Sequence, residues 1–398
     1  MTNAILTLNA GSSSIKFALF DVKPDGFECA IEGEAEGIGT SPHLLIRNNG
    51  QIALEKKWEN AKDLGYEPLL GEVLDWLENH LGADRLVAAG HRVVHGGRKF
   101  FAPVLITEDV VKDLEGLIDL APLHEPHNIE PMRLLFKLRP ELPQVACFDT
   151  AFHHTMPDVA KWIPIPRKYH DQGVLRYGFH GLSYEYISSC LPKVAPNLAK
   201  GRVVVAHLGN GASMCAIKDG KSVDSTMGFT ALDGLMMGTR TGAIDAGVML
   251  YMMQSCNMDA DALTSLFYKE SGLQGVSGIS SDVRKLLEST APEAKEALDL
   301  FVFKAAHQAA GLVTSLGGLD GLIFTAGIGE HAAPIRAGIC DRLAWMGIKI
   351  SDEANKANAG IISTPDSQIE VRVIPTNEEL VIARHTFKLA LADESARG

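Results

Sequence analysis

The chain opens on a strand–bend–strand segment that returns in its second half. Apolar residues 5–8 lead into Asn9, Gly11 and three serines, and alternating apolar residues resume from Ile15. Residues 202–217 follow the same plan, with Asn210 and Gly211 in the bend. Apolar alternation on both sides of turn-forming residues predicts two β-hairpins. Because one hairpin opens each half, the sequence predicts an internally duplicated protein. Chance recurrence is the alternative, since strand–glycine–strand segments are common.

Each predicted bend is a candidate phosphate site. Successive backbone amides in a bend form a concavity that suits an anion, and small residues allow a phosphate to approach closely. An ordinary Gly/Ser hairpin is the alternative for either bend taken alone. The shared Asn, Gly and Ser favour a duplicated protein that closes on a nucleotide from both sides.

Composition excludes several classes of function. The 398 residues carry a formal charge of −12, which argues against binding to nucleic acid or to an anionic membrane. No apolar run approaches the length that spans a bilayer, and no export signal precedes the first strand. Six cysteines occur without a CxxC pair, so we expect reduced core residues of a cytoplasmic protein.

Periodicity and capping signals predict the remaining elements. Antiparallel strands are expected up to residue 50, and a helix over 61–81 stopped by Gly82. Thr107 is a predicted N-cap, residues 121–128 are predicted to be irregular, and a long helix is expected over 292–316. Buried strands are predicted at 143–148, 322–326 and 371–374. We expect a first domain over 1–150, joined by a C-terminal helix over 380–398, and a second over 151–379.

Polar residues follow predicted strands or lie in glycine-bounded bends. Arg92, Asp149, His180 and Arg240 are placed in this way, where ligands collect in α/β sheets. A solvated loop is the alternative for Arg92, and a capping role for Asp149. Asn9, Asp149 and Glu378 are oxygen donors of the kind that Mg²⁺ prefers. No P-loop, protein-kinase or GxSxG motif occurs, and the GxG after residue 326 is a weak nucleotide signal.

Motifs in a fixed order carry a resemblance to a known family. They are NAGSSSIKF, HRVVHGG, APLHxPxN (residues 121–128), FDTAFHHTMP, YGFHGLS, HLGNGAS, STMGFT, GTRTG, SGISSDVR, FTAGIGE and PTNEEL. This series resembles the acetate kinase (acetokinase) family of the sugar kinase–Hsp70–actin superfamily, from Asn9 to about Ile382. The resemblance implies an α/β fold with two actin-like ATPase (ribonuclease H-like) domains, each a mixed sheet flanked by helices, and a nucleotide cleft between them. It also implies a homodimer and reversible phosphoryl transfer from ATP to acetate.

Site roles come from the same resemblance, position by position. Asn9 and Glu378 would hold Mg²⁺, with Mn²⁺ as a substitute, and Asp149 would be the catalytic acidic residue. His180 and Arg240 would stabilise the transferring phosphoryl group. The acid would contact Arg92, Val94, Leu123, His124, Phe179 and the position held by Ala231. The nucleotide, ATP or ADP, would contact Lys16, His207, Leu208, Gly209, Asn210, Gly211, Asp282, Val283, Arg284, Gly327, Ile328, Gly329, Glu330 and His331.

The chain departs from the family pattern at five positions. Ala231 replaces a usual Pro, Glu125 an Asn and Tyr184 a His, and Ala243 and Ala246 replace the Asp and Pro of GDIDP. Glu125 is expected to add a negative charge next to His124, near the predicted anion site. The smaller Ala231 predicts room for one more methylene in the acyl pocket, so propionate is expected as a substrate as well as acetate. One methylene changes the discrimination between substrates by only about 1–3 kcal/mol. A propionate or butyrate kinase, a family member with another phosphoryl donor, and a non-catalytic nucleotide-driven clamp are the alternatives.

Overall fold

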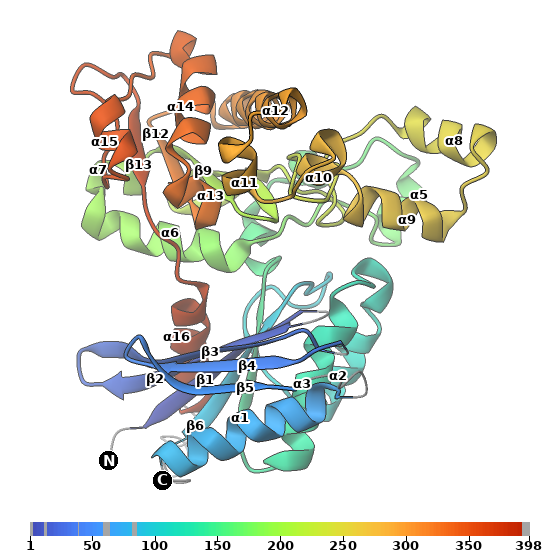
Figure 1. Ribbon diagram of the computed structural model, residues 1–398, viewed down its shortest axis with the longest axis vertical. Helices are drawn as coiled ribbons and strands as arrows, with labels where there is room; N and C mark the ends of the chain where they lie inside the picture. The colour runs from blue at the N-terminus through green and yellow to red at the C-terminus, as the bar shows by residue number, and fades with distance from the viewer. Residues whose placement is uncertain (1–2, 12–13, 39, 59–63, 82–85, 392–398) are drawn as a thin grey trace. The chain divides into compact units, whose positions relative to one another are not determined.

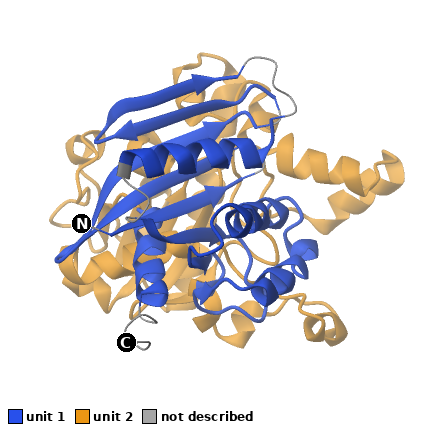
Figure 2. Cartoon of the chain, turned by 90° about the horizontal axis from the view of Figure 1, so that it is seen from below, with its two compact units in different colours: residues 1–151, 377–398 blue, residues 152–376 orange. Residues whose placement is uncertain are grey.

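The structure is a computed structural model that describes residues 3–11, 14–38, 40–58, 64–81 and 86–391. The chain forms two compact units, Met1–Ala151 with Asn377–Gly398 and Phe152–Thr376 (Figure 2). Each unit is built on its own mixed sheet with helices packed against it (Figure 1). The predicted α/β class is therefore confirmed. No helix in the described part of the chain is both long and apolar enough to cross a bilayer.

Unit 1 contains a sheet with the strand order β5-β4-β3-β2-β1-β6-β8-β7 in its described residues. The strands are β1 (Ala4–Ala10), β2 (Ser14–Lys23), β3 (Gly26–Glu36), β4 (His43–Asn48), β5 (Gln51–Lys57), β6 (Leu86–Val93), β7 (Val104–Leu105) and β8 (Gln144–Phe148). The helices are α1 (Tyr66–Leu81), α2 (Glu108–Glu115), α3 (Glu125–Leu138) and α16 (Glu378–Ala390).

Alternation along β1 distributes its side chains between two layers of helices. Leu6 and Leu8 share a core cluster with the apolar residues of α1, whereas Ile5 packs with Ala383 of α16. Successive strand residues point to opposite faces, so a single apolar strand supplies both cores. Gly90 of β6 allows α16 to approach, since a Cβ there would lie 2.2 Å from Oγ1 of Thr386.

Unit 2 contains a sheet with the order β11-β10-β9-β12-β13. Its strands are β9 (Arg202–Leu208), β10 (Ala212–Lys218), β11 (Lys221–Ser225), β12 (Gly321–Thr325) and β13 (Glu370–Val373). Its helices are α4 (Asp158–Lys161), α5 (Arg167–Asp171), α6 (Gly181–Val194), α7 (Pro196–Ala199), α8 (Ala246–Ser255), α9 (Ala260–Lys269), α10 (Gly272–Ser277), α11 (Val283–Glu288), α12 (Pro292–Leu316), α13 (Ala326–His331), α14 (Ala333–Arg342) and α15 (Asp352–Lys356).

The two sheets repeat one topology. In unit 1 the antiparallel hairpin β1–β2 continues into β3, and β6 and β8 follow in parallel on the other side of β1. In unit 2 the hairpin β9–β10 continues into β11, and β12 and β13 follow in parallel beside β9. The duplication read from the two Asn/Gly bends is thus present in the strand order.

One local prediction was wrong, and others fall outside the described residues. Residues 121–128 were predicted to be irregular, but α3 begins at Glu125 with Pro126 in its first turn. Proline is tolerated there because the first amides of a helix have no partner within it. Ser12, Ser13, Gly82 and residues 392–398 lie outside the described residues, so the predictions made for them stay predictions.

Candidate active site

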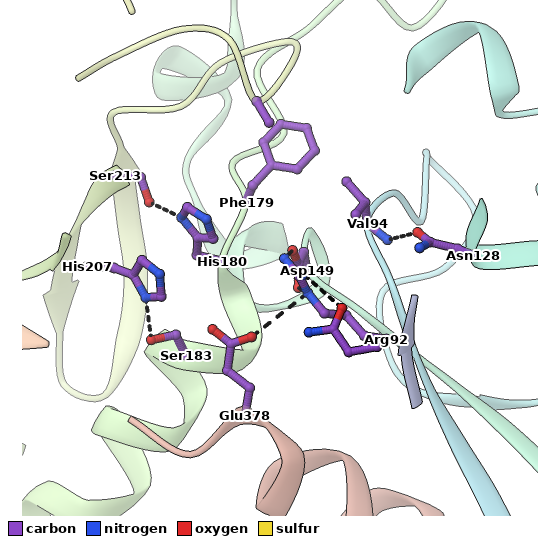
Figure 3. Close-up of polar contacts among 12 residues, drawn as sticks. Arg92, Val94, Asn128, Asp149, Phe179, His180, Ser183, His207, Ser213 and Glu378 are labelled. Atoms are coloured by element: carbon purple, nitrogen blue, oxygen red, sulfur yellow. Dashed lines mark hydrogen bonds and ion pairs between the residues drawn. The ribbon is translucent and has the colours of Figure 1, made fainter. Parts of the chain in front are cut away.

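Arg92 is the centre of a polar cluster in unit 1. Its Nε and Nη2 donate to Oδ1 and Oδ2 of Asp149 at 3.1 and 2.6 Å. Nη1 donates to Oδ1 of Asn9 at 3.1 Å, and Nε lies 3.8 Å from Oε2 of Glu378. Figure 3 shows Arg92 with Asp149 and Glu378. The pairing with Asp149 is the bidentate geometry for which a guanidinium is suited.

Strand order explains why these residues meet. Asn9, Arg92 and Asp149 lie at or just beyond the carboxyl ends of β1, β6 and β8, which are neighbouring parallel strands. The Asp149 N–H continues the ladder by donating to the Val93 carbonyl at 2.9 Å. Glu378 is the first residue of α16, whose N-cap Asn377 accepts from the Leu380 N–H. Side chains 57 residues apart in sequence, such as Arg92 and Asp149, therefore share one sheet edge.

Burial and charge oppose each other in this cluster. Burial would lower the pKa of Arg92, but the negative charges of Asp149 and Glu378 outweigh it and raise the pKa above its usual value. Burial raises the pKa of Glu378, and Arg92 opposes that rise. The buried Asp149 and the partly buried Glu378 thus share one guanidinium, which leaves the cluster able to accept a further cation.

The chain around Arg92 is fixed by a buried amide that the sequence analysis did not select. Asn128 of α3 accepts from the Val94 N–H at 2.9 Å and donates to the Ala10 carbonyl at 2.8 Å. It therefore ties α3 to the ends of β1 and β6 (Figure 3). Val94 is buried, Leu123 is half-buried, and His124 is the N-cap of α3. Asn128 is the last residue of the motif at residues 121–128 quoted above, so the sequence did contain a signal that could have selected it.

Glu125 is a buried acid without an ion-pair partner in the described residues. Its side chain is fully buried, and neither carboxyl oxygen has a hydrogen-bond partner there. Burial raises the pKa of Glu125 to about 8, with the backbone amide of His95 opposing the rise and the charge of Asp149 adding to it. This acid is thus held neutral at pH 7, and the extra negative charge expected next to His124 is absent.

In unit 2, His180 lies between a strained turn and a buried strand. It adopts a left-handed backbone conformation with φ of 56° directly before α6. His153 supports this turn, because its Nε2–H donates to the Phe179 carbonyl at 2.9 Å and its Nδ1 contacts Ser222 Oγ at 2.9 Å. Burial lowers the pKa of His153 to about 4, so it stays neutral. Non-glycine residues in this conformation cost energy and are concentrated at functional sites.

His180 and Arg240 converge on one glycine of the second hairpin. A Cβ atom placed on Gly211 would lie 3.5 Å from Nε2 of His180 and 3.8 Å from Nη1 of Arg240. The guanidinium of Arg240 is oriented by a backbone contact, since its Nη1 donates to the Ala231 carbonyl at 3.0 Å. Its own carbonyl accepts from the Met237 N–H at 3.0 Å. The two residues that are predicted to act on the phosphoryl group, His180 and Arg240, therefore meet at the bend.

The same bend borders a cavity of about 550 Å³ in unit 2. It is lined by Gly209, Asn210, Ser281, Asp282, Val283, Arg284, Leu287, Gly327, Ile328, His331 and Ala332. Its volume is that of a small-molecule site. Asp282 caps α11 by accepting from the Arg284 N–H, and its carboxylate also pairs with the Arg284 guanidinium. Ala326, which precedes Gly327, has φ of 63°, so it also adopts the left-handed conformation that a side chain disfavours.

Other residues predicted to bind nucleotide are not among those that line this cavity. Leu208 and Gly329 are buried, and Glu330 accepts from the Thr376 N–H. The ring of His207 stacks on His180 at 4.2 Å. Lys16 belongs to unit 1, where it is exposed and pairs with Glu34 at 3.8 Å. Sequence reasoning did not select Ser281, Leu287 and Ala332 of the cavity wall.

A buried arginine supports one wall of the cavity. Arg336 is fully buried and donates to the carbonyls of Gly329 and Glu330, each at 2.9 Å. It also donates to Asn355 and Asn358. It thereby fixes the end of α13, whose Gly327, Ile328 and His331 line the cavity. An isolated Arg in a predicted helix gave no signal of this role.

Comparison with known proteins places the chain in a family. The family model described as the acetokinase family matches residues 4–384. The chain belongs to the acetokinase family. An acetate kinase of Rhodopseudomonas palustris is 49% identical over 396 residues, 98% of this chain and 99% of that protein. An acetate kinase of Methylocella silvestris is 48% identical over 404 residues, the full length of both.

Solved structures of the acetokinase type share the fold. A propionate kinase from Francisella tularensis has a TM-score of 0.92 at 39% identity, covering 97% of this chain and 100% of that chain. An acetate kinase from Porphyromonas gingivalis has a TM-score of 0.87 at 35% identity, covering 97% and 99%. The family resemblance drawn from the ordered motifs is confirmed.

Proposed function

We propose that this protein is an acetate kinase, which transfers the γ-phosphoryl group of ATP reversibly to acetate and gives acetyl phosphate and ADP. The observation that carries the proposal is the meeting of His180 Nε2 and Arg240 Nη1 at Gly211, next to a cavity bordered by Gly209 and Asn210. A guanidinium and an imidazole beside a cavity of this volume suit a transferring phosphoryl group. Family membership gives the reaction class.

The acid substrate needs no general base. A simple carboxylic acid has a pKa near those of Asp and Glu, about 4, so it is already ionised at pH 7. The barrier is the repulsion between two anions, which cationic side chains reduce. We assign Arg92 to the substrate carboxylate, with Val94, Leu123, His124 and Phe179 around the acyl group, and His180 and Arg240 to the phosphoryl oxygens.

We propose Asn9, Asp149 and Glu378 as the residues that hold Mg²⁺. The donors fit, because these three side chains offer hard amide and carboxylate oxygens around a single guanidinium. When bound, Mg²⁺ would neutralise charge on the phosphate oxygens of ATP. Asp149 would then act mainly by organising this set, since its substrate needs no base.

The alternative substrate is propionate. A solved structure similar to this chain over nearly its whole length is described as a propionate kinase. In this chain Ala231 supplies the carbonyl that accepts from Arg240, so its replacement of a proline alters the residue on which that arginine rests.

A hydroxamate assay with ATP and Mg²⁺ tests the proposal. Acetate should give product, and kcat/KM should fall from acetate through propionate to butyrate. A higher kcat/KM for propionate than for acetate would make propionate the substrate, and no product with any acid would overturn the kinase assignment.

We also propose that the protein is a cytoplasmic homodimer. Helix α8 supports the dimer, because none of its residues is buried within the chain. Its exposed apolar residues are Met249, Leu250, Tyr251 and Met253, and an apolar helix without a cover is typical of an interaction surface. The cytoplasm is where ATP is available, and cell fractionation would test that location.

A further inference from the structure

A serine hydroxyl in unit 2 bridges His180 to a buried tyrosine. Ser213 Oγ lies 2.8 Å from Nδ1 of His180 and 2.5 Å from the hydroxyl of Tyr184. Ser213 and Tyr184 are both fully buried. Ser213 is on β10, two residues beyond Gly211, and Tyr184 is one turn into α6, where its N–H donates to the His180 carbonyl. The three polar groups therefore form a line that ends at the imidazole.

Proton counting limits how this line can be arranged. The Ser213 hydroxyl contacts two neighbours but has only one proton, so it can donate to only one of them. If both neighbours donated to it, the Ser213 proton would be left without an acceptor in a buried place, which costs about 1–3 kcal/mol. Two arrangements remain, which run in opposite directions. In the reverse one, Nδ1 of His180 donates to Ser213 and a neutral His180 presents a lone pair at Nε2. In the other, Tyr184 donates to Ser213, and Ser213 donates to Nδ1 of His180. The proton of a neutral His180 then resides on Nε2.

A second hydroxyl relay runs in the opposite sense on the ring that stacks against His180. Ser183 Oγ donates to Oγ1 of Thr376 at 2.9 Å, and it lies 2.8 Å from Nδ1 of His207. Because the Ser183 proton is used toward Thr376, Nδ1 of His207 carries the proton that this contact needs. When Tyr184 is the donor to Ser213, the two stacked imidazoles are set in opposite tautomers by neighbouring residues of α6, Ser183 and Tyr184.

We propose that Tyr184 is a positioning residue that, through Ser213, holds His180 as the Nε2–H tautomer. Its effect is to present an N–H donor, and not a lone pair, at the side of Gly211 that Arg240 also approaches. An anionic phosphoryl oxygen is attracted by that donor and would be repelled by the lone pair. This inference rests on the proposed role of His180 in phosphoryl transfer.

The Tyr184→Phe variant removes the hydroxyl and keeps the ring. It should lower kcat about tenfold, the equivalent of a lost hydrogen bond, and change KM for ATP and acetate by less than about twofold. Tyr177→Phe is the matched control, because Tyr177 is buried and its hydroxyl donates to the Gly173 carbonyl at 2.8 Å. That variant should keep wild-type kcat. A Tyr184→Phe enzyme with wild-type kcat would overturn the inference.

The tautomer itself is measured by ¹⁵N NMR of labelled histidine. If Tyr184 had a purely structural role, its replacement would not change the His180 tautomer. In the wild-type protein we expect a protonated Nε2 and a bare Nδ1 for His180, with the reverse for His207. Tyr184→Phe should change the His180 signals and leave those of His207. A wild-type His180 that is protonated on Nδ1 alone would refute the proposal, even if the variant failed to fold.

A His180→Ala variant separates this inference from the proposed function. Loss of kcat in His180→Ala with none in Tyr184→Phe overturns the role of Tyr184 alone. Unchanged kcat in both overturns the phosphoryl role of His180 and the inference with it. Losses in both variants, together with the expected tautomer, support the inference.

Discussion

At the scale of the residue, unit 1 buries charge in two contrasting ways. Arg92 is surrounded by Asp149, Asn9 and Glu378, so every nitrogen of its guanidinium has an oxygen partner and two of these partners are acidic. Glu125 has no such partners in the described residues, and it remains neutral instead. Both outcomes follow from the high cost of an isolated buried charge, which is either paired or neutralised by a shifted pKa.

The neutral state of Glu125 predicts a pH-dependent effect on stability. Its pKa is about 8 in the folded chain against 4.5 as its usual value, so the folded state binds more protons between these pH values. Stability from this group therefore falls as pH rises from about 4.5 to about 8. Glu125→Gln should match wild type near pH 5 and be more stable by about 3–5 kcal/mol at pH 8.

Urea unfolding at both pH values checks this expectation. Glu130→Gln on the same helix is the control, because Glu130 is only half-buried and should give a much smaller difference between the two pH values. A stability gain in Glu125→Gln that is the same at pH 5 and pH 8 would show that Glu125 is ionised in the folded protein.

The two arginines of the site should separate in steady-state kinetics. Arg240→Ala should lower kcat by about 10³-fold, because an arginine on a transferring phosphoryl group contributes roughly 10³–10⁵ in rate. Arg92→Lys keeps a charge for Asp149 but loses bidentate geometry, so it should mainly raise KM for acetate. Lysine is the better test at Arg92, since alanine would leave two carboxylates buried without a cation. Equal changes in kcat and KM in both variants would contradict this division.

At the scale of the element, the bend between β9 and β10 carries more of the site than its length suggests. Gly209 and Asn210 border the cavity, and Gly211 lies against His180 and Arg240. Ser213, two residues further, is the hydroxyl that contacts His180. Because the hairpin is part of a buried sheet, these groups are fixed by strand register and not by a mobile loop.

Gly211→Ala should therefore fold but react slowly. Its Cβ would make ordinary contacts of 3.5 and 3.8 Å, so stability should be near wild type. The methyl group would occupy the place where His180 and Arg240 meet, and kcat should fall about 100-fold. Gly311→Ala in α12 is the control, because nothing lies within 4 Å of a Cβ there. Wild-type kcat in Gly211→Ala would show that the phosphoryl group does not pass this glycine.

At the scale of the whole molecule, duplication gives each unit the same strand order but different chemistry. The edge formed by β1, β6 and β8 holds the Arg92 cluster with its two carboxylates. The bend of the other sheet holds His180 and Arg240. A repeated scaffold thus supplies acidic groups suited to a cation in one unit and cationic groups suited to phosphate in the other.

The exposed face of α8 predicts the assembly state. Light scattering should give twice the chain mass of 42.9 kDa for the wild-type protein. Leu250→Lys, at a side chain that is 55% exposed, should shift the protein toward the monomer. Leu287→Lys, at another exposed leucine of unit 2, should leave the dimer intact. A monomeric wild type would contradict the homodimer, and an unaffected Leu250→Lys dimer would place its interface elsewhere.

The sequence by itself determined the elements and the edges on which polar residues lie. Both hairpins, the N-cap Thr107 and the helix beginning at Pro292 are where neighbouring residues predict them. Asn9, Arg92 and Asp149 were placed at strand ends, and parallel pairing brings strand ends together. These features depend on residues close in the chain, so a single sequence is sufficient to read them.

Only the tertiary structure decided the state of each side chain. Sequence showed Glu125 as an added negative charge, but burial keeps it neutral. It showed Tyr184 as a departure from a pattern, while its contact with Ser213 joins residues 29 positions apart. Protonation and tautomer depend on burial and on partners that are distant in sequence, and local patterns carry no record of either.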